Sequence, residues 1–115
     1  MNILIIGNHQ QSAIYSGVLS GYGDDIAEVH TPAEAYSLLA AGLKPRTVIL
    51  DLKFADLRDI IPALRAIGGE QIRIIVIGGD SAADSLALKR GANVFLHKPV
   101  GAEAILSAVH SIASQ

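Results

Sequence analysis

The residues with the clearest chemical potential are an aspartate and a lysine that each follow a short apolar segment. Asp51 comes directly after residues 47–50, and Lys98 comes shortly after residues 93–96, with Pro99 fixing the next turn. If both segments are strands of one parallel sheet, their carboxyl ends meet at one edge, where the two side chains can pair. Such a pair can carry a phosphoryl group, with Asp51 as the nucleophile and Lys98 neutralising phosphoryl charge. The alternative is an ordinary ion pair that caps the sheet, because such pairs are common and contribute little.

Five short apolar segments alternate with five longer amphipathic ones. We expect strands over 3–6, 25–29, 47–50, 72–77 and 93–96. We expect helices over 10–20, from 32 to a stop at Gly42, and over 56–67, 81–90 and 101–112. Strands that are apolar on both faces indicate a sheet covered by helices on both sides. The order (βα)₅ with short, right-handed connections predicts a three-layer α/β fold of the flavodoxin-like type, with a parallel sheet in the order 2-1-3-4-5.

The helical segments carry two further signals. Apolar spacing predicts the inward side chains of the first helix, which are Ile14, Val18 and Leu19. Thr31 and Glu34 have capping-box spacing at the start of the second helix. Pro62 falls inside the third helix, so we expect that helix to start late or to kink.

Length and composition limit the class of protein. A chain of 115 residues predicts a single domain spanning 1–115. Half of the residues are hydrophobic and the mean hydropathy is +0.41, which excludes intrinsic disorder. The net charge of −2 argues against nucleic-acid binding, and the lack of cysteine excludes disulfides and thiolate metal sites. No apolar run approaches the ~20 residues that span a membrane, so we expect a cytoplasmic location and no membrane contact.

With these residues in place, the whole chain resembles a response-regulator receiver domain of two-component systems, in the CheY-like superfamily. Asp51 holds the position of that family's phosphoacceptor. Gly91-Ala92, Phe95 and Lys98-Pro99 match the family's "GA…(Y/F)…KP" segment, and length and element order agree over essentially all 115 residues. The resemblance implies phosphoryl transfer to Asp51 from a sensor histidine kinase.

The metal-binding part of the family's site differs here. Receivers follow the first strand with two acidic residues that hold Mg²⁺, and here those positions are Gly7 and Asn8. The oxygens left to Mg²⁺ are those of Asp51, the Asn8 side chain and the backbone carbonyl of Lys53. These ligands carry little anionic charge, so we expect a weak or absent Mg²⁺ site.

The switch and the interaction surface also come from the resemblance. Receivers end strand four with a Thr or Ser, and here that position is Gly78. Without its hydroxyl, we expect Phe95, the family's switch aromatic, to be a plain core or edge side chain. The face of helix four, strand five and helix five, where receivers dimerise or meet partners, includes Leu86, Lys89, Arg90 and Phe95.

Two functional classes remain open. The first is a receiver that is phosphorylated on Asp51 or, because the acids are lost, a pseudo-receiver that acts by protein–protein contact with a kinase, another signalling protein or a second copy. The second is a flavodoxin-like domain that binds a nucleotide or flavin at the loop after strand one and at Gly78-Gly79. An independent enzyme has the least support, because no nucleophile–base pair is visible.

The histidines give no metal motif in the sequence. His9 is expected near the crevice at the strand ends, whereas His30 and His110 are expected to be peripheral. No two histidines have metal-ligand spacing within one element.

Overall fold

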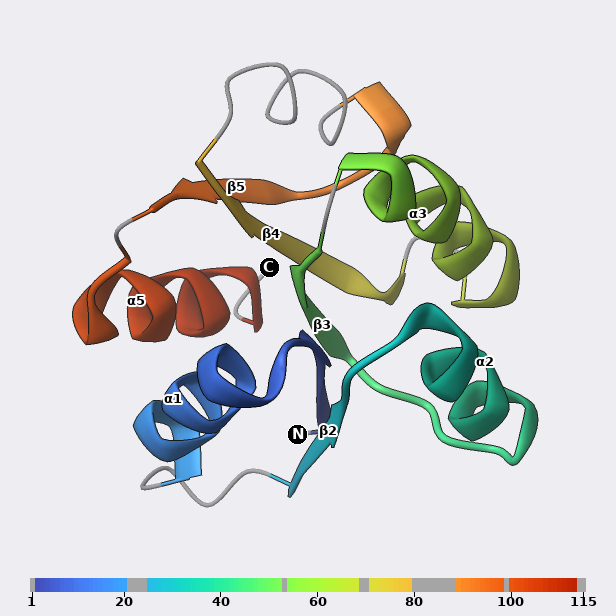
Figure 1. Ribbon diagram of the computed structural model, residues 1–115, viewed down its shortest axis with the longest axis horizontal. Helices are drawn as coiled ribbons and strands as arrows, with labels where there is room; N and C mark the ends of the chain where they lie inside the picture. The colour runs from blue at the N-terminus through green and yellow to red at the C-terminus, as the bar shows by residue number, and fades with distance from the viewer. Residues whose placement is uncertain are drawn as a thin grey trace.

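A computed structural model describes residues 2–20, 25–52, 54–68, 71–79, 89–98 and 100–113. The labels of Figure 1 are used throughout. The strands are β1 (Asn2–Gly7), β2 (Asp25–Val29), β3 (Thr47–Asp51), β4 (Arg73–Gly78) and β5 (Val94–His97). The helices are α1 (His9–Ser20), α2 (Pro32–Ala40), α3 (Phe54–Gly68) and α5 (Ala102–Ala113).

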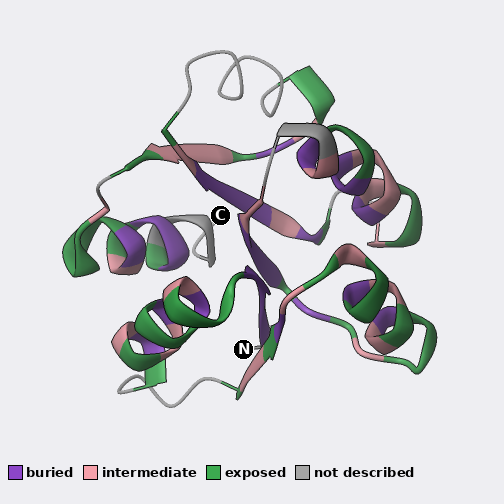
Figure 2. Ribbon diagram, in the orientation of Figure 1, coloured by how far each residue is buried: buried purple, intermediate pink, exposed green. Residues whose placement is uncertain are grey.

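The strands form one parallel sheet in the order β2-β1-β3-β4-β5, which confirms the predicted order. Helices α1 and α5 cover one face of the sheet, and α2 and α3 cover the other (Figure 1). Figure 2 shows buried residues along β1, β3 and β4 and on the sheet-facing sides of the helices. The central strands are therefore apolar on both faces because both faces are covered.

The alternation of side chains along the strands divides the core into two clusters. Odd-numbered residues of β1, β3 and β4, such as Ile5 and Ile49, pack toward α1 and α5. Even-numbered residues, such as Ile6 and Leu50, pack toward α2 and α3. In β5 the numbering is reversed, because Val76 of β4 pairs with Phe95. This alternation decides on which side each residue at the strand ends projects.

The first helix is rotated relative to the sequence prediction. Ser12, Tyr15 and Leu19 are its buried residues, whereas Ile14 is 55% exposed and Val18 is only partly buried. The prediction of Ile14 as an inward residue was therefore wrong and that of Leu19 was correct, while Val18 lies between the two. The Tyr15 ring packs in the core cluster on this face, and its hydroxyl reaches a polar group at the end of the sheet.

The other helices agree with the predicted pattern except at α3. The N-cap half of the predicted capping box of α2 is confirmed, since the Thr31 hydroxyl accepts a hydrogen bond from the Glu34 N–H at 3.2 Å, while Glu34 Oε1 accepts the His30 N–H. Helix α3 begins at Phe54 and includes Pro62, so of the two expected alternatives, a late start or a kink, the late start was wrong. The predicted helix over 81–90 lies outside the described residues, apart from 89–90, which are helical. Among the described helices, none is both long and apolar enough to cross a membrane.

Hydrogen bonds to an arginine explain the positive φ of the glycine that precedes β5. Gly91 has a φ of +115°, and its carbonyl accepts hydrogen bonds from Arg65 Nε at 3.0 Å and Nη2 at 2.6 Å. The same guanidinium donates to the Ile72 carbonyl and to Asn93 Oδ1, which also accepts the Ile74 N–H at 2.8 Å. Arg65 thus joins α3 to the amino ends of β4 and β5, and the left-handed conformation at Gly91 aims the carbonyl at it.

Candidate functional site at the carboxyl edge of the sheet

The carboxyl ends of the strands bring the predicted site residues into one row. Gly7 of β1 pairs with Asp51 of β3, and Gly78 of β4 pairs with His97 of β5. Asp51 continues the odd-numbered series of β3 and therefore projects toward the side of α1 and α5. Lys98 follows the even-numbered residues of β5, which face the same side. Strand alternation alone places the carboxylate and the ammonium on one face.

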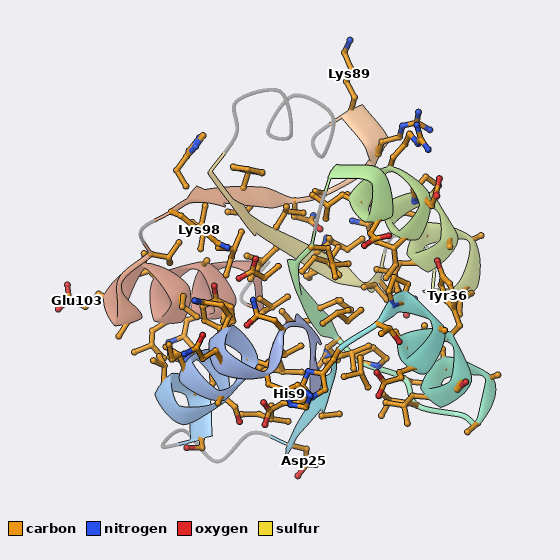
Figure 3. All side chains as sticks on the ribbon, viewed as in Figure 1. His9, Asp25, Tyr36, Lys89, Lys98 and Glu103 are labelled. Carbon is orange, nitrogen blue, oxygen red and sulfur yellow. The ribbon has the colours of Figure 1, made fainter. Side chains whose placement is uncertain are left out.

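Both oxygens of the Asp51 carboxylate have a protein partner. Lys98 Nζ lies 2.8 Å from Oδ1, and the Tyr15 hydroxyl donates to Oδ2 at 2.7 Å. The Asp51 side chain is only 7% exposed, whereas that of Lys98 is 42% exposed. The Lys98 backbone is fixed in turn, since its N–H donates to the Gly78 carbonyl at 2.8 Å. In Figure 3, Lys98 lies between β5 and α5.

Tyr15 is the site residue that the sequence reasoning missed. It comes from α1, its side chain is buried, and its ring belongs to the core cluster between the sheet and α1. Burial, the hydrogen bond to Asp51 and the charge of Asp51 all raise the pKa of Tyr15. The hydroxyl therefore keeps its proton and remains a donor to the carboxylate at neutral pH. The available signal was the i, i+3, i+7 spacing of Ser12, Tyr15 and Leu19.

Gly7 leaves little space beside Asp51 for a second carboxylate. A Cβ atom at Gly7 would lie 3.2 Å from the Asp51 Cβ, 3.2 Å from the Asp51 carbonyl oxygen and 3.4 Å from Ser12 Oγ. The Ser12 hydroxyl is buried and has no hydrogen-bond partner among the described residues. The end of β1 is therefore packed closely against Asp51 and α1, in the place where receivers are expected to carry an acidic side chain.

Asn8, at the second of the two positions where receivers carry an acidic residue, caps the first helix. Asn8 Oδ1 accepts the Gln11 N–H at 2.8 Å, and the Asn8 carbonyl accepts the Ser12 N–H at 2.9 Å. Asn8 is thus the N-cap of α1 and is exposed to solvent. Lys53, whose backbone carbonyl was the third predicted ligand, lies outside the described residues.

The described residues do not fit Mg²⁺. This ion is a hard cation that takes oxygen ligands, usually including one or two carboxylates with free charge. The charge of Asp51 is matched by Lys98, and its other oxygen accepts the Tyr15 hydroxyl. Asn8 directs its amide oxygen to the helix backbone, and Gly7 has no side chain. The described part of the edge thus offers no uncompensated carboxylate to a metal ion.

The switch positions are in contact with each other. A Cβ atom at Gly78 would lie 3.1 Å from Phe95 Cζ, so the phenyl ring fills the place of the missing side chain. Phe95 packs against the core on the side of α2 and α3, and its ring meets the ring of His97 edge-on, with centroids 4.8 Å apart. The ring is therefore partly buried, in keeping with the prediction of a core or edge aromatic.

The predicted interaction face is described only in part. Lys89 and Arg90 are exposed, and Figure 3 shows Lys89 projecting from the outer end of its segment. Leu86 lies outside the described residues. Of the four residues predicted for this face, the described ones are the exposed Lys89 and Arg90 and the partly buried Phe95.

Two histidines meet at the ends of β1 and β2, and one of them corrects a prediction. The rings of His9 and His30 have centroids 3.6 Å apart and are tilted by 33°. His30 Nδ1 lies 2.9 Å from the Gly7 carbonyl oxygen. The prediction that His30 is peripheral was therefore wrong. The sequence alone does not predict this pair, because the two histidines lie in different elements and only the strand order of the sheet brings them together.

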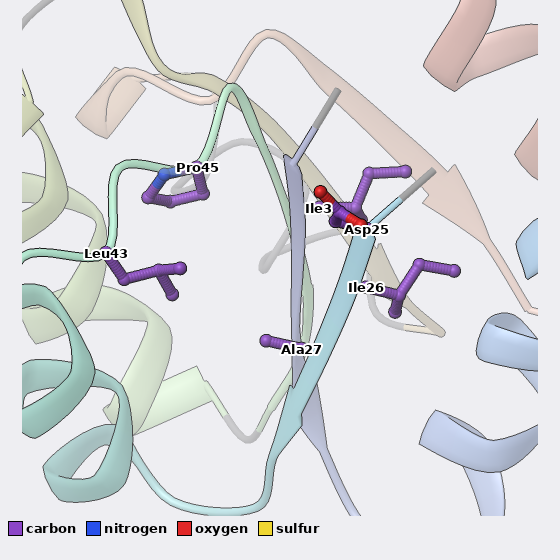
Figure 4. A pocket seen from close by; sticks show the side chains of 6 residues that line it. All are labelled: Ile3, Asp25, Ile26, Ala27, Leu43 and Pro45. Carbon is purple, nitrogen blue, oxygen red and sulfur yellow. The ribbon is translucent and has the colours of Figure 1, made fainter. Parts of the chain in front are cut away.

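A cavity of about 240 Å³ lies at the opposite edge of the sheet (Figure 4). Its lining residues are Ile3, Asp25, Ile26, Ala27, Leu43 and Pro45. In parallel α/β sheets, nucleotides and flavins bind beyond the carboxyl ends of the strands. This cavity lies near the amino ends of β1 and β2, so it gives no support to the nucleotide or flavin alternative.

Solved structures of receivers closely match this architecture. The receiver domain of NtrX from Brucella abortus is 20% identical, with a TM-score of 0.88 over 98% of each chain. A two-component response regulator from Clostridium difficile is 21% identical, with a TM-score of 0.87 over 100% of this chain and 97% of that one. The signal receiver domain of a signal transduction histidine kinase from Syntrophus aciditrophicus is 22% identical, with a TM-score of 0.84 over 98% of this chain and 89% of that one. The sequence matches no protein-family model, and no curated protein matches it significantly.

The strand order and the extent of these matches define the fold. These matches cover 98% to 100% of this chain. The chain therefore has the flavodoxin-like α/β fold of response-regulator receiver domains.

Proposed function

We propose that this chain is a pseudo-receiver: a two-component signalling module that acts by protein–protein contact and takes no phosphoryl group on Asp51. The observation that carries the proposal is the double engagement of the Asp51 carboxylate, by Lys98 at 2.8 Å and by the Tyr15 hydroxyl at 2.7 Å. The receiver fold supports the signalling class, and the altered edge supports the loss of phosphoryl chemistry.

Phosphoryl transfer to a carboxylate needs a free oxygen and positive charge around the incoming group. A donated hydrogen bond from Tyr15 reduces the nucleophilicity of Oδ2, and Lys98 occupies Oδ1. The approaching phosphoryl group is itself anionic, and a metal ion normally neutralises it at such sites. Among the described residues of this edge, the Lys98 ammonium group alone would have to serve both the phosphoryl group and Asp51. This arrangement favours a structural role for the Asp51 carboxylate over a role as the nucleophile in phosphoryl transfer.

The conformation of the switch positions supports the same proposal. Phosphorylation-dependent signalling requires a side chain that hydrogen-bonds the phosphoryl oxygens and moves when the phosphoryl group is added. Gly78 has no hydroxyl to do so, and the Phe95 ring already occupies the adjacent space. The surface that the domain presents to partners therefore does not change in response to phosphorylation. Its expected partners are a histidine kinase, another signalling protein or a second copy bound through the face of β5 and α5.

Magnesium binding tests the proposal directly. We would titrate ¹⁵N-labelled protein with Mg²⁺ and follow the amide signals of Gly7, Asp51 and their neighbours, with Asp51→Asn as the control. The proposal expects only small, linear shifts, equal in both proteins. Saturable shifts that disappear in Asp51→Asn would overturn it, because they would show a working metal site at the carboxylate.

A further inference from the structure

We propose that His9 and His30 form a binding site for a borderline transition-metal ion such as Zn²⁺, at the ends of β1 and β2. The two imidazole rings are already in contact, with centroids 3.6 Å apart, although 21 positions of sequence separate them. This site is separate from the Asp51–Lys98 pair and does not rest on the proposed function.

The hydrogen bond of His30 fixes which ring nitrogen is available. The Gly7 carbonyl oxygen can only accept, so Nδ1 of His30 must carry the proton that forms the 2.9 Å contact. In the neutral ring, Nε2 then holds the free lone pair. Metal-binding histidines typically donate their other ring N–H to a backbone carbonyl or carboxylate, which fixes tautomer and orientation. His30 has this arrangement before any metal is bound.

The backbone around both histidines is held in place. The His30 N–H donates to Glu34 Oε1 at 3.4 Å, within the capping box that starts α2. His9 is the first residue of α1, directly after the N-cap Asn8. Because Ile6 of β1 pairs with Val29 of β2, the two ring-bearing segments leave the sheet side by side. Little conformational entropy is then lost when a metal ion joins the rings.

The His9 and His30 side chains differ in how far they can move, and this difference allows both rings to turn toward one metal ion. His30 is partly buried and tied to Gly7, whereas His9 is exposed (Figure 3). Stacked rings do not aim their lone pairs at one point, and the observed tilt is 33°. A rotation of the exposed His9 ring therefore completes the site around the fixed His30 ring.

The chemistry of the ligands selects the class of metal. Neutral imidazole suits Zn²⁺, Ni²⁺ and Cu²⁺, whereas Mg²⁺ requires oxygen ligands. Within the described ranges, no group of three or more His, Cys, Asp or Glu side chains is placed to hold a metal ion. Water molecules must complete the coordination shell, so we expect affinity in the micromolar range rather than that of a structural zinc site.

Isothermal titration of the chain without a histidine tag tests this proposal. The probe is Zn²⁺, with Mg²⁺ as the comparison ion. His9→Ala is the main variant because His9 is exposed, so we expect its loss to leave the fold intact. His30→Ala is the second variant, and His97→Ala and His110→Ala are matched controls on other elements.

We expect saturable binding of one Zn²⁺ per chain, no binding of Mg²⁺ at this site, and a loss of ~10-fold or more in affinity in His9→Ala and in His30→Ala. His97→Ala, His110→Ala and Asp51→Asn should bind Zn²⁺ as the parent chain does. In NMR spectra, Zn²⁺ should shift the ring signals of His9 and His30 together. Absence of saturable Zn²⁺ binding overturns the proposal, and so does binding that survives in His9→Ala or disappears in either control.

Discussion

Replacing Tyr15 by phenylalanine removes a single hydroxyl and keeps the ring that packs between α1 and the sheet. The hydroxyl donates to a carboxylate that is 7% exposed, and the tyrosine itself is buried. Hydrogen bonds to charged groups contribute about 1.5–3 kcal/mol, and their loss here leaves one oxygen of a poorly solvated carboxylate without a donor. We therefore expect Tyr15→Phe to lower the free energy of unfolding by about 1.5–3 kcal/mol.

The same hydroxyl gives the protein a dependence on alkaline pH. The pKa of Tyr15 is raised in the folded state by burial and by Asp51, above the value of about 10 that it has in the unfolded chain. Its contribution is thus fully present below pH ~10 and is lost above it, as the unfolded chain releases the proton first. The loss approaches about 1.4 kcal/mol per pH unit. Tyr15→Phe should lack this part of the alkaline decline.

Urea unfolding followed by circular dichroism measures both effects. The Tyr15→Phe variant should show a lower midpoint with an unchanged slope. Tyr36→Phe is the matched control, since Tyr36 lies partly exposed on α2 and should change stability by less than ~0.5 kcal/mol. In an Asp51→Asn background, the cost of Tyr15→Phe should fall to that of a neutral hydrogen bond, about 0.5–1.5 kcal/mol. A cost below 0.5 kcal/mol in the parent chain, or an equal cost in both backgrounds, would refute the role given to Tyr15.

Three further predictions concern glycines. Gly91→Ala should destabilise the fold by about 1–2 kcal/mol in urea unfolding, since its φ is +115° and its Cβ would lie 3.3 Å from Arg65 Nε; an unchanged midpoint would contradict this. Gly17→Ala should instead stabilise the fold by about 0.5–1 kcal/mol, because Gly17 lies inside α1 with open space around it, and a lower urea midpoint would contradict this prediction. Gly78→Thr should displace the Phe95 ring, seen as a shift of its NMR signals, at a cost of about 1–3 kcal/mol that shrinks when Phe95 is alanine. Additive costs in that pair would show that the two residues do not compete for space.

Much of the fold follows from local patterns. Apolar runs, the capping box of Thr31 and Glu34, and the alternating order of elements predicted the parallel sheet and its order correctly. Strand ends followed by Asp51 and Lys98 also predicted where these two side chains would meet. These features depend on neighbours in sequence and on the general rules of parallel sheets, so one sequence is enough to recognise them.

The site partners from helices and loops were harder to predict. Ile14 and Tyr15 are neighbours on α1, and apolarity alone favours the wrong one as the inward residue. Burial of Tyr15 becomes favourable only because Asp51 accepts a hydrogen bond from its hydroxyl, which is a tertiary contact across 36 positions. Similarly, His30 meets His9 only because β2 lies beside β1 in the sheet. Such partners emerge from packing and polar pairing together, which hydrophobic periodicity does not encode.

The most direct test of the pseudo-receiver proposal is the intact mass of the protein after incubation with a small-molecule phosphodonor, with and without Mg²⁺, beside Asp51→Asn. Because Lys98 and Tyr15 hold both oxygens of Asp51, we expect the mass to stay unchanged under every condition. A Mg²⁺-dependent increase of one phosphoryl group that is absent in Asp51→Asn would contradict the proposal and show that the carboxylate remains a working phosphoacceptor.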